Sequence, residues 1–272
     1  LQKICLMHGI EVDYYKKLFQ TAGNIIELIE KDDIPKYLLF LENVFPYMDN
    51  YNYQKGMKEI IQELKNFLKP KDIGTDSDRA LLLDFQATLE IKPEKAIKLE
   101  KDALAQIENI TADNARLVSN LHANLGGLYR MNGHPDLARE HMEKSISLLD
   151  QFNLLHINDS IPQIANYAMF LTEQQEPERG ISELQKLSGI IKEYHSDDCL
   201  DYAKVQETLG TIYLMTANLP QAKTHFKRAF KIYEKIWADE PEMIEAKYQE
   251  IQELYPQIGF CIGKNLSGLL TK

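Results

Sequence analysis

The sequence predicts an all-α protein, a right-handed α-solenoid of antiparallel helix pairs, and three observations lead to this prediction. The stretch NLGGLYRMNGHPDLAREHMEKS, which begins at Asn124, returns 84 residues later as TLGTIYLMTANLPQAKTHFKRA, which begins at Thr208. A fainter copy, NYAMFLTEQQEPERGISELQKL, lies halfway between them, so the period is 42 residues. Prolines next to turn-forming residues keep the same period at Pro93, Pro135 and Pro177. A fixed period of this length is typical of stacked helical repeats.

Small residues recur at two positions of the repeat and predict a close contact between the two helices of each pair. In the first helix they are Gly126, Ala168 and Gly210, and in the second helix they are Ala96, Ala138, Gly180 and Ala222. Larger residues follow four positions later, at Met142, Leu184 and Phe226. A bulky side chain at the small positions would hold the two backbones apart. Each copy is therefore predicted to be a hairpin that buries its apolar face when neighbouring hairpins stack on it.

The order of elements along the chain suggests three parts. Residues 1–70 form an N-terminal helical segment with three predicted helices, and residues 34–69 within it resemble a diverged hairpin. The charged run Lys69–Asp78 has the composition of a connecting loop. Residues 71–240 hold the repeats, and residues 241–272 continue as a helix and a tail that cap the stack, with Trp237 expected to anchor the last repeat.

Composition excludes several classes of protein. The net charge is −10 and no run of basic residues interrupts the acidic balance, which disfavours a general affinity for nucleic acid or an anionic membrane. The longest apolar runs are far shorter than the roughly 20 residues of a membrane-spanning helix. Three widely separated cysteines suit a reducing cytoplasm. Because the chain begins with Leu1, we expect it to be a piece of a longer protein.

The sequence shows no pattern that would carry catalysis or hold a cofactor. It has no glycine-rich phosphate loop and no GxSxG or DxDxDG pattern, and His134 and His141 lack the HExxH spacing of a zinc site. The cluster HSDDC, from His195 to Cys199, gathers groups that can bind a metal, but without a partner cluster it favours a turn. We therefore expect no enzyme activity, no cofactor and no metal.

The repeat resembles the tetratricopeptide repeat family, whose pattern places Leu-Gly-x-x-Tyr on the first helix and Ala-x-x-x-Phe-x-x-Ala on the second. The best copy has Leu209, Gly210, Tyr213, Ala222, Phe226 and Ala229, and the copy with Leu125, Gly126, Tyr129 and Ala138 is nearly as good. The copy near Leu83 departs from the pattern, because Asp84 stands at the small position and Glu100 at the aromatic one. The 42-residue period resembles the longer variant found in kinesin light chains and many bacterial regulatory proteins.

The resemblance implies where a ligand would bind. In this family the first helices line the concave face, and the matching positions form the predicted groove. They are Asn120, Asn124, Gly127, Arg130, Asn166, Met169, Thr172, Lys204, Thr208 and Thr211. Amides at Asn124 and Asn166 offer a donor and an acceptor to an extended peptide, or they bond a neighbouring helix instead. Arg130 and Lys204 can bind a carboxylate, but the full two-carboxylate clamp of chaperone-binding members is not visible.

The function that follows is protein–protein interaction. We expect the scaffold or sensor region of a larger, bacterial, cytoplasmic signalling protein that binds a partner protein through the concave surface, with no nucleic acid and no membrane involved. The alternative is a receptor for a short signalling peptide, as in quorum-sensing regulators with the same repeats. Catalysis is the third and least favoured class.

Overall fold

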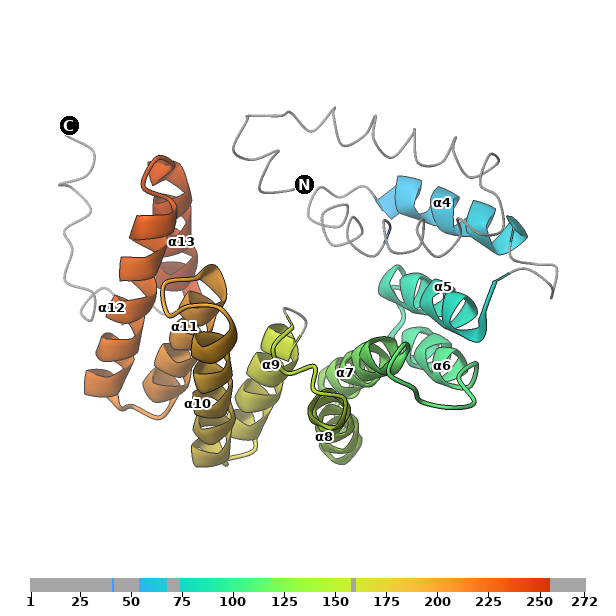
Figure 1. Cartoon of the computed structure of the whole chain (residues 1–272), viewed down its shortest axis with the longest axis horizontal. Helices are drawn as coiled ribbons and strands as arrows, with labels where there is room; N and C mark the ends of the chain where they lie inside the picture. The colour runs from blue at the N-terminus through green and yellow to red at the C-terminus, as the bar shows by residue number, and fades with distance from the viewer. Residues whose placement is uncertain (1–40, 42–53, 68–73, 158–159, 255–272) are drawn as a thin grey trace. The chain divides into compact units, whose positions relative to one another are not determined.

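The computed structural model of the 272-residue chain describes residue 41 and residues 54–67, 74–157 and 160–254. Every regular element within these residues is an α-helix. The helices are α4 Gln54–Phe67, α5 Asp76–Thr88, α6 Pro93–Leu104, α7 Ala115–Met131, α8 Pro135–Gln151, α9 Ser160–Glu173, α10 Pro177–Tyr194, α11 Leu200–Met215, α12 Leu219–Ile236 and α13 Pro241–Leu254 (Figure 1). The helices expected before residue 54 and the tail after 254 lie outside the described residues.

The helices from α5 to α12 pair in sequence order as hairpins. Helices α5 and α6 pack on each other, as do α9 and α10, and α11 and α12, while α7 and α8 meet at Gly126 and Met142. The second helices α6, α8, α10 and α12 begin at Pro93, Pro135, Pro177 and Leu219, so the interval is 42 residues throughout. The prediction of an all-α solenoid of helix pairs is confirmed.

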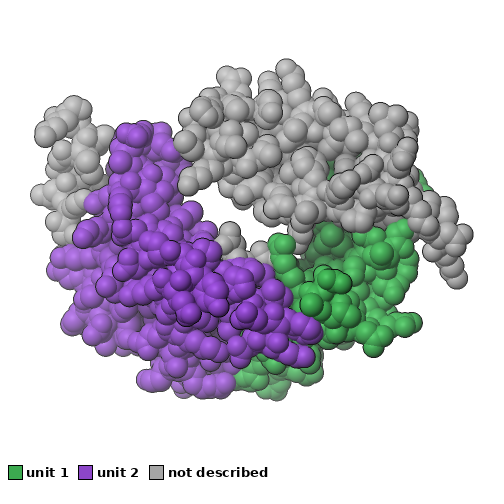
Figure 2. Space-filling model, viewed as in Figure 1, with its two compact units in different colours: residues 1–148 green, residues 149–272 purple. Residues whose placement is uncertain are grey.

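The chain divides into two compact units (Figure 2). Unit 1 is Leu1–Leu148 and unit 2 is Leu149–Lys272, so the division falls in the last turn of α8. Within unit 2, α9 packs on α10 and on α11, and α11 packs on α10 and α12. Within unit 1, α7 contacts both α5 and α6. The three-part division at residues 70 and 240 that the sequence suggested stays a prediction.

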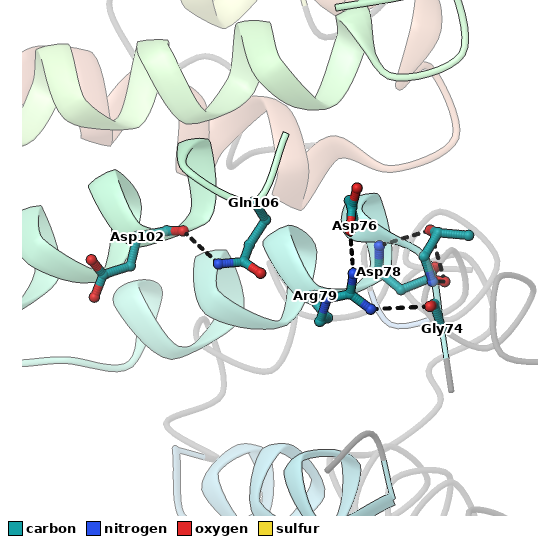
Figure 3. A network of polar contacts seen from close by, with 7 residues as sticks. Gly74, Asp76, Asp78, Arg79, Asp102 and Gln106 are labelled. Atoms are coloured by element: carbon teal, nitrogen blue, oxygen red, sulfur yellow. Dashed lines mark hydrogen bonds and ion pairs between the residues drawn. The ribbon is translucent and has the colours of Figure 1, made fainter. Parts of the chain in front are cut away.

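The first helix of the first hairpin begins earlier than the sequence suggested. Asp76–Asp78 was assigned to a loop, but these residues form the first turn of α5. The reason is a capping box: Thr75 Oγ1 accepts from the Asp78 amide at 3.2 Å, and Asp78 Oδ2 accepts from the Thr75 amide at 2.6 Å. Arg79 adds an ion pair with Asp76 and a 3.1 Å hydrogen bond to the Gly74 carbonyl (Figure 3).

The turns inside the last three hairpins share one backbone motif. A residue with positive φ occupies the same repeat position each time, Gly133 at 75°, Gln175 at 64° and Ala217 at 59°. The amide of the following residue donates to a carbonyl five residues back in each hairpin, for example from His134 to Tyr129 at 2.9 Å. This is the Schellman end of a helix, which satisfies carbonyls that the helix leaves free. Only the second hairpin fills the position with glycine, the residue best suited to it.

The small residues permit close approach of the helices, as predicted. A Cβ atom added to Gly126 would lie 2.5 Å from Met142 Cγ, and one added to Gly210 would lie 2.9 Å from the ring of Phe226. The contact at Gly180 is with backbone, because an added Cβ would lie 2.6 Å from the Ala168 carbonyl oxygen. Real Cβ atoms do not approach this closely, so these hairpins can close only on small residues.

Helix α13 is anchored on the last hairpin through polar and aromatic contacts. The rings of Phe230 and Tyr248 stack in parallel with centroids 4.1 Å apart, and Lys247 Nζ lies 2.9 Å from Glu207 Oε1. Burial opposes the charge of Lys247, but the carboxylates of Glu207 and Glu250 outweigh it and raise its pKa. The aromatic contact between the last hairpin and α13 is thus made by Phe230 and Tyr248, whereas Trp237, the residue after α12, stacks on Tyr233 of α12.

Two glycines of α10 provide a matched test of close helix approach. Gly180→Ala places a methyl group against the backbone of α9, and we expect it to destabilise unit 2 by about 1–3 kcal/mol. Gly189→Ala, in the same helix, meets no atom within 4 Å and should stabilise the protein by about 0.5–1 kcal/mol through helix propensity. Urea unfolding of both variants checks the pair, and equal effects would contradict the packing argument.

The shared turn gives a second matched test. Ala217→Gly removes the cost of a left-handed backbone at a residue with a Cβ atom, partly offset by the greater freedom of glycine in the unfolded chain. We expect the variant to be more stable by about 0.5–1 kcal/mol, and Gly133→Ala, which meets no neighbour within 4 Å, to be less stable by a similar amount. Thermal unfolding monitored by circular dichroism measures both, and shifts of the same sign would rule out this account.

Candidate functional site

The predicted groove residues lie on the first helices of the hairpins. In unit 1, α7 carries Asn120, Asn124, Gly127 and Arg130, of which Asn124 is exposed and the other three are half-buried. Their spacing of three or four residues puts them on one face of α7. We call these four residues the unit 1 part of the predicted groove.

Asn124 is held by the hairpin that precedes it. Its Nδ2 atom donates to Asp84 Oδ1 on α5 at 2.8 Å, across two neighbouring first helices. Of the two roles that the sequence left open for this amide, the structure shows the bond to a neighbouring helix. The side chain remains exposed, so its position is fixed by Asp84 while it still faces solvent.

Beneath Asn124 lies a buried acid that breaks the repeat pattern. Glu100 on α6 is 2% exposed, and its Oε2 atom has no hydrogen-bond partner among the described residues. Burial, reinforced by the charge of Asp84 and a hydrogen bond with it, raises the pKa of Glu100 to about 10. Glu100 is therefore protonated at neutral pH and can donate to Asp84. The residues at the small and aromatic positions of this hairpin have become a hydrogen-bonded acid pair.

The predicted groove residues of unit 2 lie on α9 and α11, which pack on each other, and we call them the unit 2 part of the predicted groove. Asn166 and Lys204 are exposed, and Met169, Thr172 and Thr208 are half-buried. The Asn166 amide makes no hydrogen bond within the described residues, and Lys204 Nζ lies 3.8 Å from Asp201. The hydroxyl groups of Thr172 and Thr208 each donate to a carbonyl one turn earlier, at 2.9 and 3.0 Å.

Thr211 differs from the other predicted groove residues. It is only 8% exposed, because it lies on the side of α11 that packs within unit 2. The position matches Met169 of the preceding hairpin and Gly127 of the one before, both half-buried. A ligand on this face would therefore meet Met169 more readily than Thr211.

A histidine–tyrosine contact that was not predicted from the sequence recurs at the 84-residue interval. His141 stacks on Tyr129 with centroids 5.4 Å apart, and His225 stacks on Tyr213 at 5.3 Å. In each case the histidine Nδ1 atom bonds the first helix at 2.9 Å, to His122 Nδ1 in unit 1 and to Gln206 Oε1 in unit 2. The alignment of the two copies placed these residues in register and could have found the contact.

The histidine pair of unit 1 stabilises the fold at neutral pH. Burial, together with the charges of His141 and Lys144, lowers the pKa of His122 to about 4. Nδ1 atoms 2.9 Å apart require one protonated and one bare nitrogen, so two imidazolium rings cannot keep the bond. Because this pKa is below its unfolded value of 6.5, the contribution is full above about pH 6.5 and is lost as the pH falls toward 4.

The cluster HSDDC forms a structural turn. Cys199 caps α11 by accepting from the Tyr202 amide, Asp198 pairs with Lys235 of α12, and the His195 ring lies 3.0 Å from the His156 carbonyl oxygen. The hydrogen bond and charge of Lys235 lower the pKa of Asp198. In the part of the chain that the structure describes, no three His, Cys, Asp or Glu side chains gather as metal ligands. No helix in that part is long and apolar enough to cross a membrane.

The stacked hairpins define a class of helical-repeat protein, and comparisons with known proteins specify it. The tetratricopeptide repeat family model matches residues 160–235. The crystal structure of BtubC (BKLC) from P. vanneervenii is similar, with 16% identity, a TM-score of 0.50 and coverage of 81% of this chain and 74% of that one. A putative kinesin light chain with nearly identical TPR-like repeats from Podospora anserina gives 13% identity, a TM-score of 0.58 and coverage of 74% and 98%. A comparison with curated protein sequences gave no match.

Residues 160–235 therefore belong to the tetratricopeptide repeat family, and the fold of the chain is that of a tetratricopeptide-repeat solenoid. For residues 160–235, which include the second repeated stretch, the expected family is confirmed. This fold is that of a protein–protein interaction scaffold, and proteins built from it are generally not enzymes. The assignment to the 42-residue variant of kinesin light chains stays a prediction.

The buried acid pair leads to a prediction about pH. Between pH 4.5 and about 10, unfolding releases the Glu100 proton, so this residue makes stability fall with pH by up to about 1.4 kcal/mol per pH unit. Glu100→Gln keeps the shape, carries no titrating proton and can donate to Asp84. We expect it to raise the free energy of unfolding at pH 8 by about 2–3 kcal/mol and to flatten the pH dependence.

The measurement is urea unfolding of wild type and variant from pH 5 to pH 9. Glu94→Gln, at an exposed position of the same helix, is the matched control and should leave the curve unchanged. If Glu100→Gln destabilised the protein equally at every pH, Glu100 would be held in its charged form and the acid pair would be disproved.

Proposed function

We propose that this chain is the scaffold or sensor region of a larger cytoplasmic regulatory protein, bacterial in origin, that binds a partner protein through the exposed faces of its first helices. The observation that carries the proposal is the unit 2 part of the predicted groove. There an exposed amide without a bonding partner, Asn166, lies near a half-buried methionine, Met169, on α9. On the neighbouring helix α11, Lys204 and Thr208 extend the same face.

These side chains supply the contacts that a protein partner needs. The Asn166 amide can donate to and accept from a partner backbone, and Met169 offers a flexible apolar contact. The Lys204 ammonium is exposed and its ion pair with Asp201 is long, so exchanging that partner for another carboxylate costs little. In unit 1, Asp84 fixes Asn124 before any partner arrives, which reduces the entropy lost on binding.

The unbonded Asn166 amide also favours the second candidate, a receptor for a short extended peptide. Such a peptide would leave unpaired backbone groups that side-chain amides can satisfy. The two candidates differ in the ligand that binds. A peptide receptor is stabilised by a short peptide alone, whereas a scaffold needs the partner protein. A peptide at 100 times its Kd stabilises the folded state by about 2.7 kcal/mol, and a thermal-shift screen detects that gain.

The groove is tested by the double variant Asn166→Ala plus Lys204→Ala. We expect it to reduce capture of the physiological partner by about tenfold or more, since it removes an amide and a cation from the contact surface. The matched control, Gln185→Ala plus Lys186→Ala, removes the same two chemical groups from the exposed face of α10 and should leave capture intact. The measurement is quantitative affinity capture from a lysate of the source organism, followed by titration of the purified partner. Equal capture by both variants would reject the groove.

A further inference from the structure

The solvent face of α12 is basic along its whole length. All five lysine and arginine residues of this helix are exposed: Lys223, Lys227, Arg228, Lys231 and Lys235. The opposite face is apolar and buried, formed by Ala222, Phe226, Ala229, Phe230, Ile232 and Tyr233. The one acidic residue of α12, Glu234, is half-buried and accepts a 3.2 Å hydrogen bond from the Tyr248 hydroxyl of α13. We call the five exposed residues the basic face.

The charges of the basic face are mostly not neutralised within the molecule. Lys223, Lys227 and Lys231 are four residues apart on successive turns, and none has an ion-pair partner in the described part of the chain. Like charges at this spacing destabilise a helix by a few tenths of a kcal/mol per pair. Lys235 alone forms an ion pair, with Asp198. The arrangement therefore carries an internal cost that a partner of opposite charge would relieve.

Neighbouring aromatic and basic groups extend the face. The Arg228 guanidinium lies 5.8 Å from the centre of the Tyr202 ring, and Lys192 of α10 lies 5.2 Å from the centre of the same ring. Tyr202 is buried on α11, which packs on both α10 and α12 (Figure 1). A partner would thus meet two further cations, Lys192 and Arg228, beside the three lysines.

No other second helix has this character. The exposed charged residues of α8 are mainly acidic, with Asp136, Glu140 and Glu143 against Lys144. Those of α6 and α10 carry both signs, and on α6 the exposed Lys95, Lys98 and Lys101 are accompanied by the exposed acids Glu94 and Asp102. The whole chain has a net charge of −10. The basic face is therefore a local reversal of sign on an acidic protein, and composition alone does not explain it.

We propose that the basic face of α12 is a second docking surface, and that it takes an acidic helical segment of a partner protein with carboxylates on three successive turns. The spacing of the lysines favours such a partner. Glutamates at i, i+4 and i+8 of a helix are separated by a rise of about 6 Å each, which equals the rise between successive lysines of the basic face. The acidic remainder of the chain repels a long polyanion such as DNA or an anionic membrane. A short acidic segment bound to α12 does not extend to the acidic surfaces farther away, and the repulsion from those surfaces is screened beyond about 8 Å at physiological salt. This surface lies on a second helix and does not depend on the groove.

The experiment uses the full chain and a synthetic helical peptide with glutamates on three successive turns, together with its glutamine analogue. We expect fluorescence anisotropy to show binding of the glutamate peptide, loss of binding for the glutamine analogue, and weaker binding as salt rises. Lys227→Glu plus Lys231→Glu should weaken binding by about tenfold or more. Lys95→Glu plus Lys98→Glu, with the same change of net charge on exposed positions of α6, should change it less than about twofold.

Three results would overturn the proposal. They are failure of the glutamate peptide to bind, an equal loss in the α6 control, and undiminished binding by Lys227→Gln plus Lys231→Gln, the milder variant used if the charge reversal unfolds the protein. Duplex DNA or phosphatidylserine vesicles that bind more tightly than the peptide, with the same dependence on Lys227 and Lys231, would replace the protein partner with that ligand. The groove variant Asn166→Ala plus Lys204→Ala should bind the peptide normally, so failure of the groove and failure of the basic face are told apart.

Discussion

The contact between the two helix backbones of each hairpin is the constraint on which the rest of the structure depends. At Gly180 there is no room for one carbon atom against the α9 backbone, and at Gly126 and Gly210 the space is filled by a side chain of the facing helix. This contact sets the distance between the helices, and that distance decides which side chains can cross from one to the other. The first hairpin keeps the fold with different chemistry there, because the acid pair of Asp84 and Glu100 holds a proton and forms a hydrogen bond.

Much of the fold follows from local signals in the sequence. The prolines at Pro93, Pro135 and Pro177 fix where second helices begin, because proline suits the first turn of a helix. The predicted start of α5 was wrong. The charged composition of residues 69–78 favours a loop, but Thr75 and Asp78 form a capping box, and this box begins the helix. The left-handed turn residues at Gln175 and Ala217 give no signal in composition, since the hairpin geometry imposes their backbone conformation.

The repeat register predicts the candidate site as a set of positions, which stays a prediction, but it does not predict the surroundings of each side chain. The repeat register places Asn124 and Asn166 alike, yet only Asn124 has an acidic neighbour within reach, and that neighbour belongs to another hairpin. In the sequence, Asp84 and Glu100 are two separate departures from the family pattern, whereas in the fold they form one contact around the buried Glu100. The sequence did not predict the basic face of α12, because lysines four residues apart do not form a continuous basic run. They lie on one face only when the segment is helical.

The histidine–tyrosine contact has a consequence for how this solenoid can change length. In the second hairpin, and again in the fourth, this contact joins the two helices of the same hairpin. The other two hairpins have no histidine or tyrosine at the equivalent positions. These positions hold Ala80, Ala87 and Leu99 in the first hairpin and Ile164, Leu171 and Glu183 in the third. Hairpins of two chemical kinds therefore alternate along the sequence. Duplicating or excising one hairpin would break this alternation, whereas duplicating or excising a block of two hairpins would keep it. For recombination or engineering, the sequence unit that preserves the alternation is thus a tandem pair of hairpins.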